Sequence, residues 1–331
     1  MSAPKVFLIT ALAAFSMVAA VSFWKRGKSA SDDMPSQQLP QQSSQTASDQ
    51  SNMGASLDTG VKASKSSAHS DFPSIDRMYQ LFSFSQSKLP IVETLSYSST
   101  VSWLKGRPAW IADYAAYYGT SRHFIARSMH GKPDYFNQTV ASGSKFNVFR
   151  RDKNIQFHLL VDITLRKMAL YYYDIDTKER VILKTYVVGV GRIDPSRPSG
   201  SLTPLGMYTL GDKVAIYSPG ITGFFQDQKT EMIRIFGTRW IPFGMALEGA
   251  TEPAKGYGIH GAPWSVDAKS GSLIENKDCI GKYESDGCIR LKLEDMEELF
   301  SVVITKPTFV HIVKNFSEAS LPGVEVAVPT R

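Results

Sequence analysis

From Ile155 onward, similar side chains recur at every second position, the spacing of a strand with one buried face. Turn-forming residues separate the successive runs. The alternating positions are Ile155, Phe157, Leu159 and Val161, then Met168, Leu170 and Tyr172, then Val181, Leu183 and Thr185. Further strands are expected at 207–210 and 308–313, with a helix at 294–303 between them. The pattern predicts a mainly β domain at 155–314, a β-sandwich with one or two helices.

Upstream, residues 95–150 change to helical spacing and predict a small α+β module. The first helix is expected to end at Gly119, and its apolar face consists of Ile111, Tyr114, Ala115 and Tyr118. Thr120-Ser121 offers an N-cap for a second helix. Extended pieces at 100–104 and 145–149 would flank the two helices. The expected order is therefore strand, helix, helix, strand.

The N-terminus combines an apolar run with a polar tract. Residues 6–24 are apolar almost without interruption, which is long enough to cross a bilayer. We expect residues 1–28 to form a membrane anchor, and we favour this over a cleaved signal peptide. Residues 29–72 are rich in Ser and Gln, which predicts a disordered tether. Residues 315–331 are expected to be a C-terminal tail.

Bulk charge and motif content limit the possible partners. The net charge of +6 suits an anionic membrane or cell-wall surface. No RNA- or DNA-binding signature occurs, so no nucleic-acid partner is expected. The six histidines show no metal-ligand spacing, and neither an HExxH motif nor paired CxxC motifs occur. We therefore expect neither a metal nor another cofactor, and the oligomeric state stays open.

Chemistry-bearing residues concentrate in two short stretches, 259–261 and 285–291. Cys288 follows a glycine in the second stretch and is the expected nucleophile. His260 is the expected general base and acid, because an imidazole is well matched to taking a thiol proton near neutral pH. A cysteine on a tight glycine turn also exposes its own amide. With the amide of Gly287, that group would form an oxyanion hole.

Three further residues are candidates for binding substrate. Arg290 suits a substrate carboxylate because its planar guanidinium makes bidentate contacts, although an ion pair with the acidic residues that follow is the alternative. Ser285 either contacts substrate or hydrogen-bonds the backbone of its own turn. Gly261 is too small to orient His260 by a side chain, so a backbone carbonyl must hold the second ring nitrogen.

The chain has two cysteines, Cys279 and Cys288. In an exported protein, the simplest alternative to a catalytic thiol is a disulfide that closes the short loop between them. Such a bond would consume the expected nucleophile, so the two interpretations exclude each other unless the bond is regulatory.

Residues 155–314 resemble the L,D-transpeptidase catalytic domain, also called the YkuD domain. The motifs that carry the resemblance are, in chain order, Leu160-Val161-Asp162, Leu170-Tyr171-Tyr172, Val188-Gly189-Val190-Gly191, Thr203-Pro204-Leu205-Gly206, Gly258-Ile259-His260-Gly261 and Ser285-Asp286-Gly287-Cys288-Ile289-Arg290-Leu291. The resemblance implies a bacterial periplasmic or cell-envelope enzyme, which residues 6–24 would anchor in the inner membrane. Its partners would be peptidoglycan stem peptides and glycan strands.

The resemblance also implies a reaction. Cys288 would attack a tetrapeptide stem, release D-alanine and leave a thioester, which an amine then resolves. Water in place of the amine would make the protein an L,D-carboxypeptidase or endopeptidase. A catalytically silent peptidoglycan-binding protein is the alternative from another functional class.

Two features depart from the family pattern. Asp286 stands where the family usually has a histidine, and a carboxylate there would raise the pKa of the Cys288 thiol. Cys288 also lies 28 positions after His260, which is longer than the usual spacing. The surplus, residues 269–283, contains Cys279 and is expected to be an inserted loop that shapes the donor groove or acts as a lid.

The upstream module resembles a degenerate LysM module, a glycan-binding fold. Its matching residues are Ile111-Ala112, Tyr118-Gly119-Thr120, Val140, Gly143 and Phe146-Asn147-Val148. Lys105-Gly106-Arg107-Pro108 departs from the turn that the family usually carries. The module is therefore interpreted either as a glycan-binding element or as a structural helical hairpin.

Overall fold

The computed structural model describes residues 72–130 and 140–327, all within one compact unit. The expected anchor at 6–24 and most of the expected tether at 29–72 lie outside the described residues. Within 72–130 and 140–327, no helix combines the length and apolar character needed to cross a membrane.

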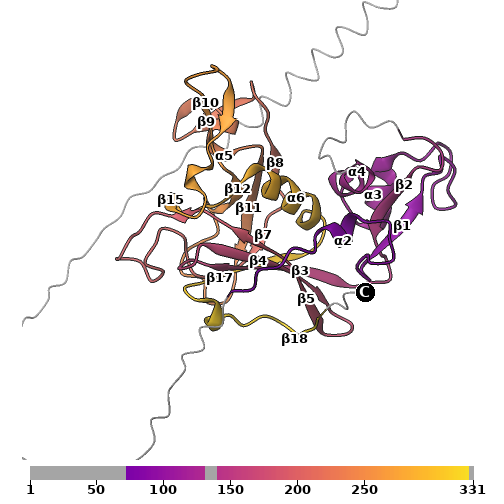
Figure 1. Ribbon diagram of the computed structural model, residues 1–331, viewed down its shortest axis with the longest axis horizontal. Helices are drawn as coiled ribbons and strands as arrows, with labels where there is room; N and C mark the ends of the chain where they lie inside the picture. The colour runs from indigo at the N-terminus through magenta and orange to yellow at the C-terminus, as the bar shows by residue number, and fades with distance from the viewer. Residues whose placement is uncertain (1–71, 131–139, 328–331) are drawn as a thin grey trace, which may run out of the picture. The chain divides into compact units, whose positions relative to one another are not determined.

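A ten-stranded sheet organises the C-terminal half of the chain (Figure 1). Its strands are β3 (Ile155–Asp162), β4 (Lys167–Asp174), β5 (Glu179–Val187), β7 (Gly206–Leu210), β8 (Ala215–Ile216), β11 (Arg239–Ala246), β12 (Gly258–Gly261), β16 (Ile289–Leu291), β17 (Thr308–Val313) and β18 (Val324–Glu325). The spatial order is β16-β12-β11-β7-β17-β3-β4-β5-β18, and β8 pairs with β11. The prediction of a mainly β domain is confirmed, because every alternating run lies in a strand of this sheet.

Both faces of the sheet are covered. On one face, Phe157, Leu159 and Val161 of β3 join a core with α6 (Leu293–Val303), whose Met296, Leu299, Phe300 and Val303 are buried as predicted. On the other face, Leu160 and Tyr171 pack with Phe72 and with apolar residues of the segment 313–321. The C-terminal segment therefore packs against the sheet, and its β18 runs parallel to β5.

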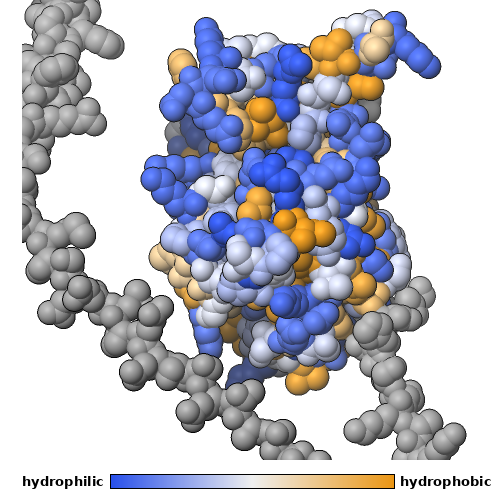
Figure 2. All heavy atoms as spheres, turned by 90° about the vertical axis from the view of Figure 1, so that its left-hand side faces the viewer, coloured by the Kyte–Doolittle hydropathy of each residue, from blue (hydrophilic) through white to orange (hydrophobic). Residues whose placement is uncertain are grey.

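Short elements decorate the sheet near the end where β12 and β16 lie. They are β6 (Val190–Gly191) paired with β15 (Tyr283–Ser285), the hairpin β9 (Thr222–Phe225) and β10 (Gln228–Glu231), α5 (Ile233–Phe236), the hairpin β13 (Trp264–Val266) and β14 (Leu273–Glu275), and the 3₁₀ turn η1 (Lys277–Cys279). A second 3₁₀ turn, η2 (Phe316–Glu318), packs against β3 instead. Figure 2 shows one face of the molecule, on which apolar side chains form separate spots between hydrophilic ones.

The upstream module is built from β1 (Val92–Ser96), α3 (Ile111–Tyr118), α4 (Arg122–His130) and β2 (Lys145–Phe149), preceded by the short α2 (Tyr79–Phe82). The order strand, helix, helix, strand is confirmed, and β1 pairs antiparallel with β2. Gly119 ends α3 in the left-handed conformation, with a φ of 58°. The Ser121 hydroxyl caps α4 by accepting a hydrogen bond from the Phe124 amide at 2.9 Å.

The predicted strand at 100–104 is wrong. The first strand lies earlier, at Val92–Ser96, and Val101 and Leu104 form only an isolated bridge across a tight turn. Both side chains still pack against the small core of the module. An apolar run that turns back on itself buries the same residues as a strand, so the sequence pattern does not distinguish the two structures.

Candidate active site

Cys288 lies in a tight turn between β15 and β16. The buried Ser285 hydroxyl donates to the Cys288 carbonyl at 2.6 Å and accepts from the Gly287 amide at 3.1 Å. Gly287 has a φ of +118°, and a Cβ there would lie 2.5 Å from a ring carbon of Tyr257 and 2.8 Å from the Leu202 carbonyl oxygen. The turn therefore requires glycine, and Ser285 holds the turn rather than facing solvent.

Thr203 closes the turn from the opposite side, a role that the sequence did not indicate. Its hydroxyl donates to the Gly287 carbonyl at 3.0 Å and accepts from the Gly191 amide at 2.7 Å. The side chain is fully buried. Thr203 belongs to the Thr-Pro-Leu-Gly motif, one of the motifs that carry the family resemblance, but the sequence assigned no role to the threonine itself. The structure shows that it ties β6 to the cysteine turn.

Cys288, His260 and Arg290 come together because β12 and β16 run side by side in parallel. His260 lies opposite Arg290 in this register, and Ile259 lies opposite Ile289. Cys288 directly precedes β16, and its thiol is influenced by the Gly258 amide of β12 and by the charge of Arg290. The pairing thus brings His260 next to Arg290, with Cys288 at the start of the same strand pair.

His260 is held as a neutral imidazole with one ring nitrogen fixed. Its Nδ1–H donates to the Gly261 carbonyl at 2.7 Å, the kind of backbone contact expected from the sequence. The ring is only 3% exposed and packs against Phe236 and Trp240, with centroid distances of 5.4 and 5.8 Å. Burial, assisted by the positive charge of Arg290, lowers the pKa of His260 to about 3. Nε2 is therefore the basic nitrogen.

The Cys288 thiol is also neutral near pH 7. Burial is the main cause that raises the pKa of this thiol to about 11, and the Asp286 carboxylate adds to the effect. The Gly258 amide and Arg290 act in the opposite direction. The Sγ contacts the Gly256 carbonyl oxygen at 3.7 Å, and no described contact joins it to the imidazole.

The Gly287 amide, the predicted oxyanion-hole donor, donates to the Ser285 hydroxyl in this structure. The same bond explains why glycine and serine occur together here: the serine satisfies an amide that the strained turn would otherwise leave unpaired. The Cys288 amide, at the end of the turn, remains the candidate donor.

Arg290 does not form the ion pair that was its alternative role. Asp295 pairs with Lys184 at 3.1 Å and Glu294 with Lys277 at 3.6 Å, whereas Arg290 pairs with no described carboxylate. Its Nε is buried without a hydrogen-bond partner among the described residues. Its guanidinium hydrogen-bonds the thiol of Cys279. Gly261, by contrast, is buried in β12 and acts through the carbonyl that orients His260.

Both cysteines are free, so the alternative of a disulfide is wrong for this structure. Cys279 is buried in η1, and its thiol donates to the Asn276 carbonyl at 3.5 Å. The expected inserted loop at 269–283 contains two short elements, β14 and η1, and β14 pairs with the preceding strand β13. Across 72–130 and 140–327, no group of three or more His, Cys, Asp or Glu side chains is arranged to hold a metal ion.

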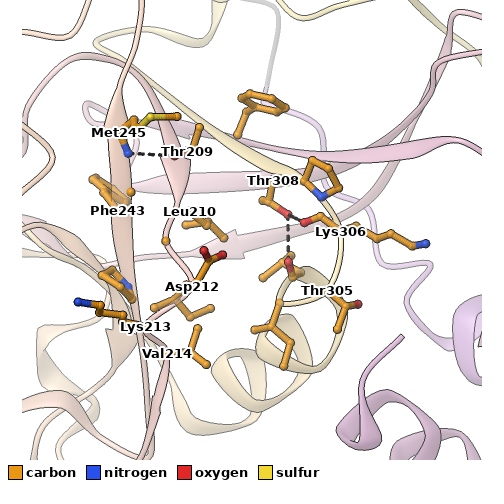
Figure 3. Close-up of a pocket in the computed structure, with 18 of the residues that line it drawn as sticks. Thr209, Leu210, Asp212, Lys213, Val214, Phe243, Met245, Thr305, Lys306 and Thr308 are labelled. Carbon is orange, nitrogen blue, oxygen red and sulfur yellow. Dashed lines mark hydrogen bonds between the residues drawn. The ribbon is translucent and has the colours of Figure 1, made fainter. Parts of the chain in front are cut away.

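A cavity of about 980 Å³ lies between β7, β11 and the segment 303–309 (Figure 3). Figure 3 shows the Asp212 carboxylate directed into it and the Lys306 side chain directed away. The lining includes Trp240, which packs on His260, but neither Cys288 nor His260 nor Arg290. The cavity is therefore not the pocket of the cysteine site.

Several solved structures are similar to about half of this chain. Bd1075 from Bdellovibrio bacteriovorus is 15% identical over 48% of this chain and 48% of its own, with a TM-score of 0.31. The helical cell shape determining protein Pgp2 from Campylobacter jejuni is 23% identical over 50% and 52%, with a TM-score of 0.32. L,D-transpeptidase 1 from Mycobacterium tuberculosis is 13% identical over 51% and 70%, with a TM-score of 0.26.

The similar region spans about half the length of Bd1075 and of Pgp2. No curated protein matches this chain. The family comparison is more specific, because it covers the segment that contains β12, β16 and the cysteine turn. Residues 156–312 match the family model YkuD, which describes the L,D-transpeptidase catalytic domain.

Proposed function

We propose that this protein is a peptidoglycan L,D-transpeptidase that uses Cys288 as its nucleophile. The observation that supports the proposal is the parallel pairing of β12 and β16, in which His260 lies opposite Arg290 and Cys288 directly precedes β16. A turn fixed by Ser285 and Gly287 presents the cysteine, and these residues lie within the segment that matches the catalytic domain.

The chemistry follows from two neutral groups that exchange a proton. His260 Nε2 takes the thiol proton as the Cys288 sulfur bonds to the carbonyl carbon before the terminal D-alanine. The imidazolium then protonates the D-alanine nitrogen as the C–N bond breaks, which leaves a thioester. An acceptor amine attacks the thioester and gives its proton to His260, and the thiolate that leaves takes that proton back.

Two residues would assist the charged groups of this reaction. The Cys288 amide would stabilise the negative charge that develops on the carbonyl oxygen. Arg290 would bind a carboxylate of the stem peptide, since its guanidinium has no anionic partner among the described residues. Arg290 is partly buried and interacts with the Cys279 thiol, which favours a fixed binding geometry.

The upstream module would bring the enzyme to glycan strands. Trp103 stacks on Tyr117 with a centroid distance of 4.3 Å and an interplanar angle of 10°, and Trp110 is 64% exposed. Aromatic faces of this kind suit the apolar faces of sugar rings. With residues 6–24 as an inner-membrane anchor, the catalytic domain would act in the periplasm.

The direct test is mass spectrometry of a purified disaccharide-tetrapeptide after incubation with the full chain under reducing conditions. A dimer that lacks one D-alanine is expected. A tripeptide without dimer would instead establish the carboxypeptidase. An unchanged muropeptide would overturn both and leave the silent binding protein.

The pH dependence of kcat/KM tests the neutral thiol–imidazole pair. The active form combines a protonated Cys288 thiol with a neutral His260 imidazole. This form dominates between pH 3 and 11, because the pKa of His260 is about 3 and that of Cys288 is about 11. We expect kcat/KM to stay within about threefold between pH 5 and 9 once substrate ionisation is corrected for. A tenfold rise per pH unit over that range would show that free thiolate, not the pair, is the reactive form.

A further inference from the structure

An exposed ion pair lies directly beside the cysteine turn. Asp286 precedes Gly287, and its carboxylate contacts the Arg192 guanidinium at 2.6 Å. The two side chains are 59% and 61% exposed, respectively. Exposed pairs contribute little to stability, typically about 1 kcal/mol or less, so stability alone does not account for this arrangement.

The backbone around Arg192 is fastened to the same turn. The Arg192 amide donates to the Ser285 carbonyl at 2.9 Å, and its carbonyl accepts from the Leu202 amide at 2.8 Å. The residue also follows β6, which pairs with β15. The guanidinium is thus held next to Asp286 by three connections that do not involve its own side chain.

The charges around the thiol show what the pair does. Asp286, in the same turn, opposes ionisation of Cys288, and Arg290 on β16 favours it. His260, on the neighbouring strand β12, is neutral near pH 7 because burial lowers its pKa to about 3. An unpaired Asp286 would therefore leave its negative charge next to the sulfur without a local counter-charge.

We propose that Arg192 is a positioning residue that binds the Asp286 carboxylate and offsets its charge, so that this carboxylate opposes ionisation of Cys288 less than it would alone. The inference rests on the proposed role of Cys288 as nucleophile. It assigns a function to the aspartate that departs from the family pattern: Asp286 and Arg192 act as one unit that sets the reactivity of the thiol.

Alkylation of Cys288 by iodoacetamide tests this without any substrate. Trypsin cleaves after Lys277, Lys282 and Arg290, so the two thiols fall in separate peptides, 278–282 and 283–290. Mass spectrometry of the full-length chain then yields a rate for each thiol from the same digest. The buried Cys279 serves as the internal control, because a variant that loosens the fold would make it reactive.

At pH 8, Arg192→Ala should slow alkylation of Cys288 by roughly threefold to tenfold, and Asp286→Asn should speed it by a similar factor. The double variant should return to within about twofold of the parent, and Arg192→Lys should stay close to it. These rate changes reflect changes in the fraction of Cys288 that is thiolate. They should therefore displace the curve of alkylation rate against pH without changing its shape.

An unchanged rate in Arg192→Ala would overturn the proposal. So would a double variant as slow as Arg192→Ala, since Arg192 would then act through backbone structure alone. If Arg192→Ala also exposes Cys279, the same criteria apply to Arg192→Gln, which keeps the side-chain stem. The alkylation rates could follow the expected pattern while the muropeptide stays unchanged in the activity test. That result would reject the proposed function but support the electrostatic role of Arg192.

Discussion

Cys288→Ala should abolish turnover of the tetrapeptide substrate, with kcat/KM falling by about 10⁴-fold or more. The reason is chemical: without the sulfur no thioester forms, and water or an amine must attack the peptide carbonyl directly. The fold should survive, because the contacts that hold the turn come from the Ser285 hydroxyl, the Gly287 backbone and Thr203 rather than from the thiol.

Intact-mass spectrometry should support this loss with a covalent intermediate. In the parent protein, a rapid quench during turnover should trap an acyl adduct on the peptide 283–290, and Cys288→Ala should show none. Cys279→Ala is the matched control: it removes a thiol of the same segment whose described polar contacts are to Arg290 and Asn276, and it should cost less than about tenfold in kcat/KM. Turnover by Cys288→Ala near the parental rate would reject covalent catalysis by this residue.

Much of the β domain could be predicted because its signals are local. Strands β3, β4 and β5 are long, alternate cleanly and follow one another as antiparallel neighbours, so short-range pattern and structure agree. Helix α6 could be predicted for the same reason, since Met296, Leu299, Phe300 and Val303 repeat at helical spacing and its acidic first turn suits a helix N-terminus.

The hairpin β9–β10 could not be predicted. Its two-residue turn is Gln226-Asp227, and both residues have positive φ values, 49° and 62°. Such turns usually carry Asn-Gly or Asp-Gly, so the sequence lacked the expected turn signal. The omission mattered for the site, because this hairpin leads into α5, where Phe236 packs on the His260 ring.

The candidate site was predicted in its residues but not in its arrangement. The motifs identified Cys288, His260 and Arg290, yet only the parallel pairing of β12 with β16 explains how they come together. Parallel neighbours are set by the path of the whole chain, which here includes a hairpin and a 3₁₀ turn between the two strands. The occupied Gly287 amide and the Arg192–Asp286 pair likewise depend on contacts that spacing does not encode.

His260→Gln should lower kcat/KM at pH 8 by about 10²- to 10⁴-fold. Glutamine can still donate a hydrogen bond to the Gly261 carbonyl, but it has no nitrogen that accepts the thiol proton. Turnover then requires thiolate formed by the solvent, so the flat pH profile of the parent should become a rise of about tenfold per pH unit. The loss should shrink as the pH approaches the pKa of Cys288, about 11.

His158→Gln provides the matched control, because His158 is also buried and its pKa is also lowered to about 3 by burial. It lies on β3, where its Nδ1 is 2.9 Å from His311 Nε2. This variant should lose stability but keep the flat profile of kcat/KM, which separates the loss of a buried imidazole from the loss of the base. If His260→Gln kept a flat profile, the proton of Cys288 would have to leave by another route. The neutral pair would then not be the catalytic unit, whatever the size of the rate loss.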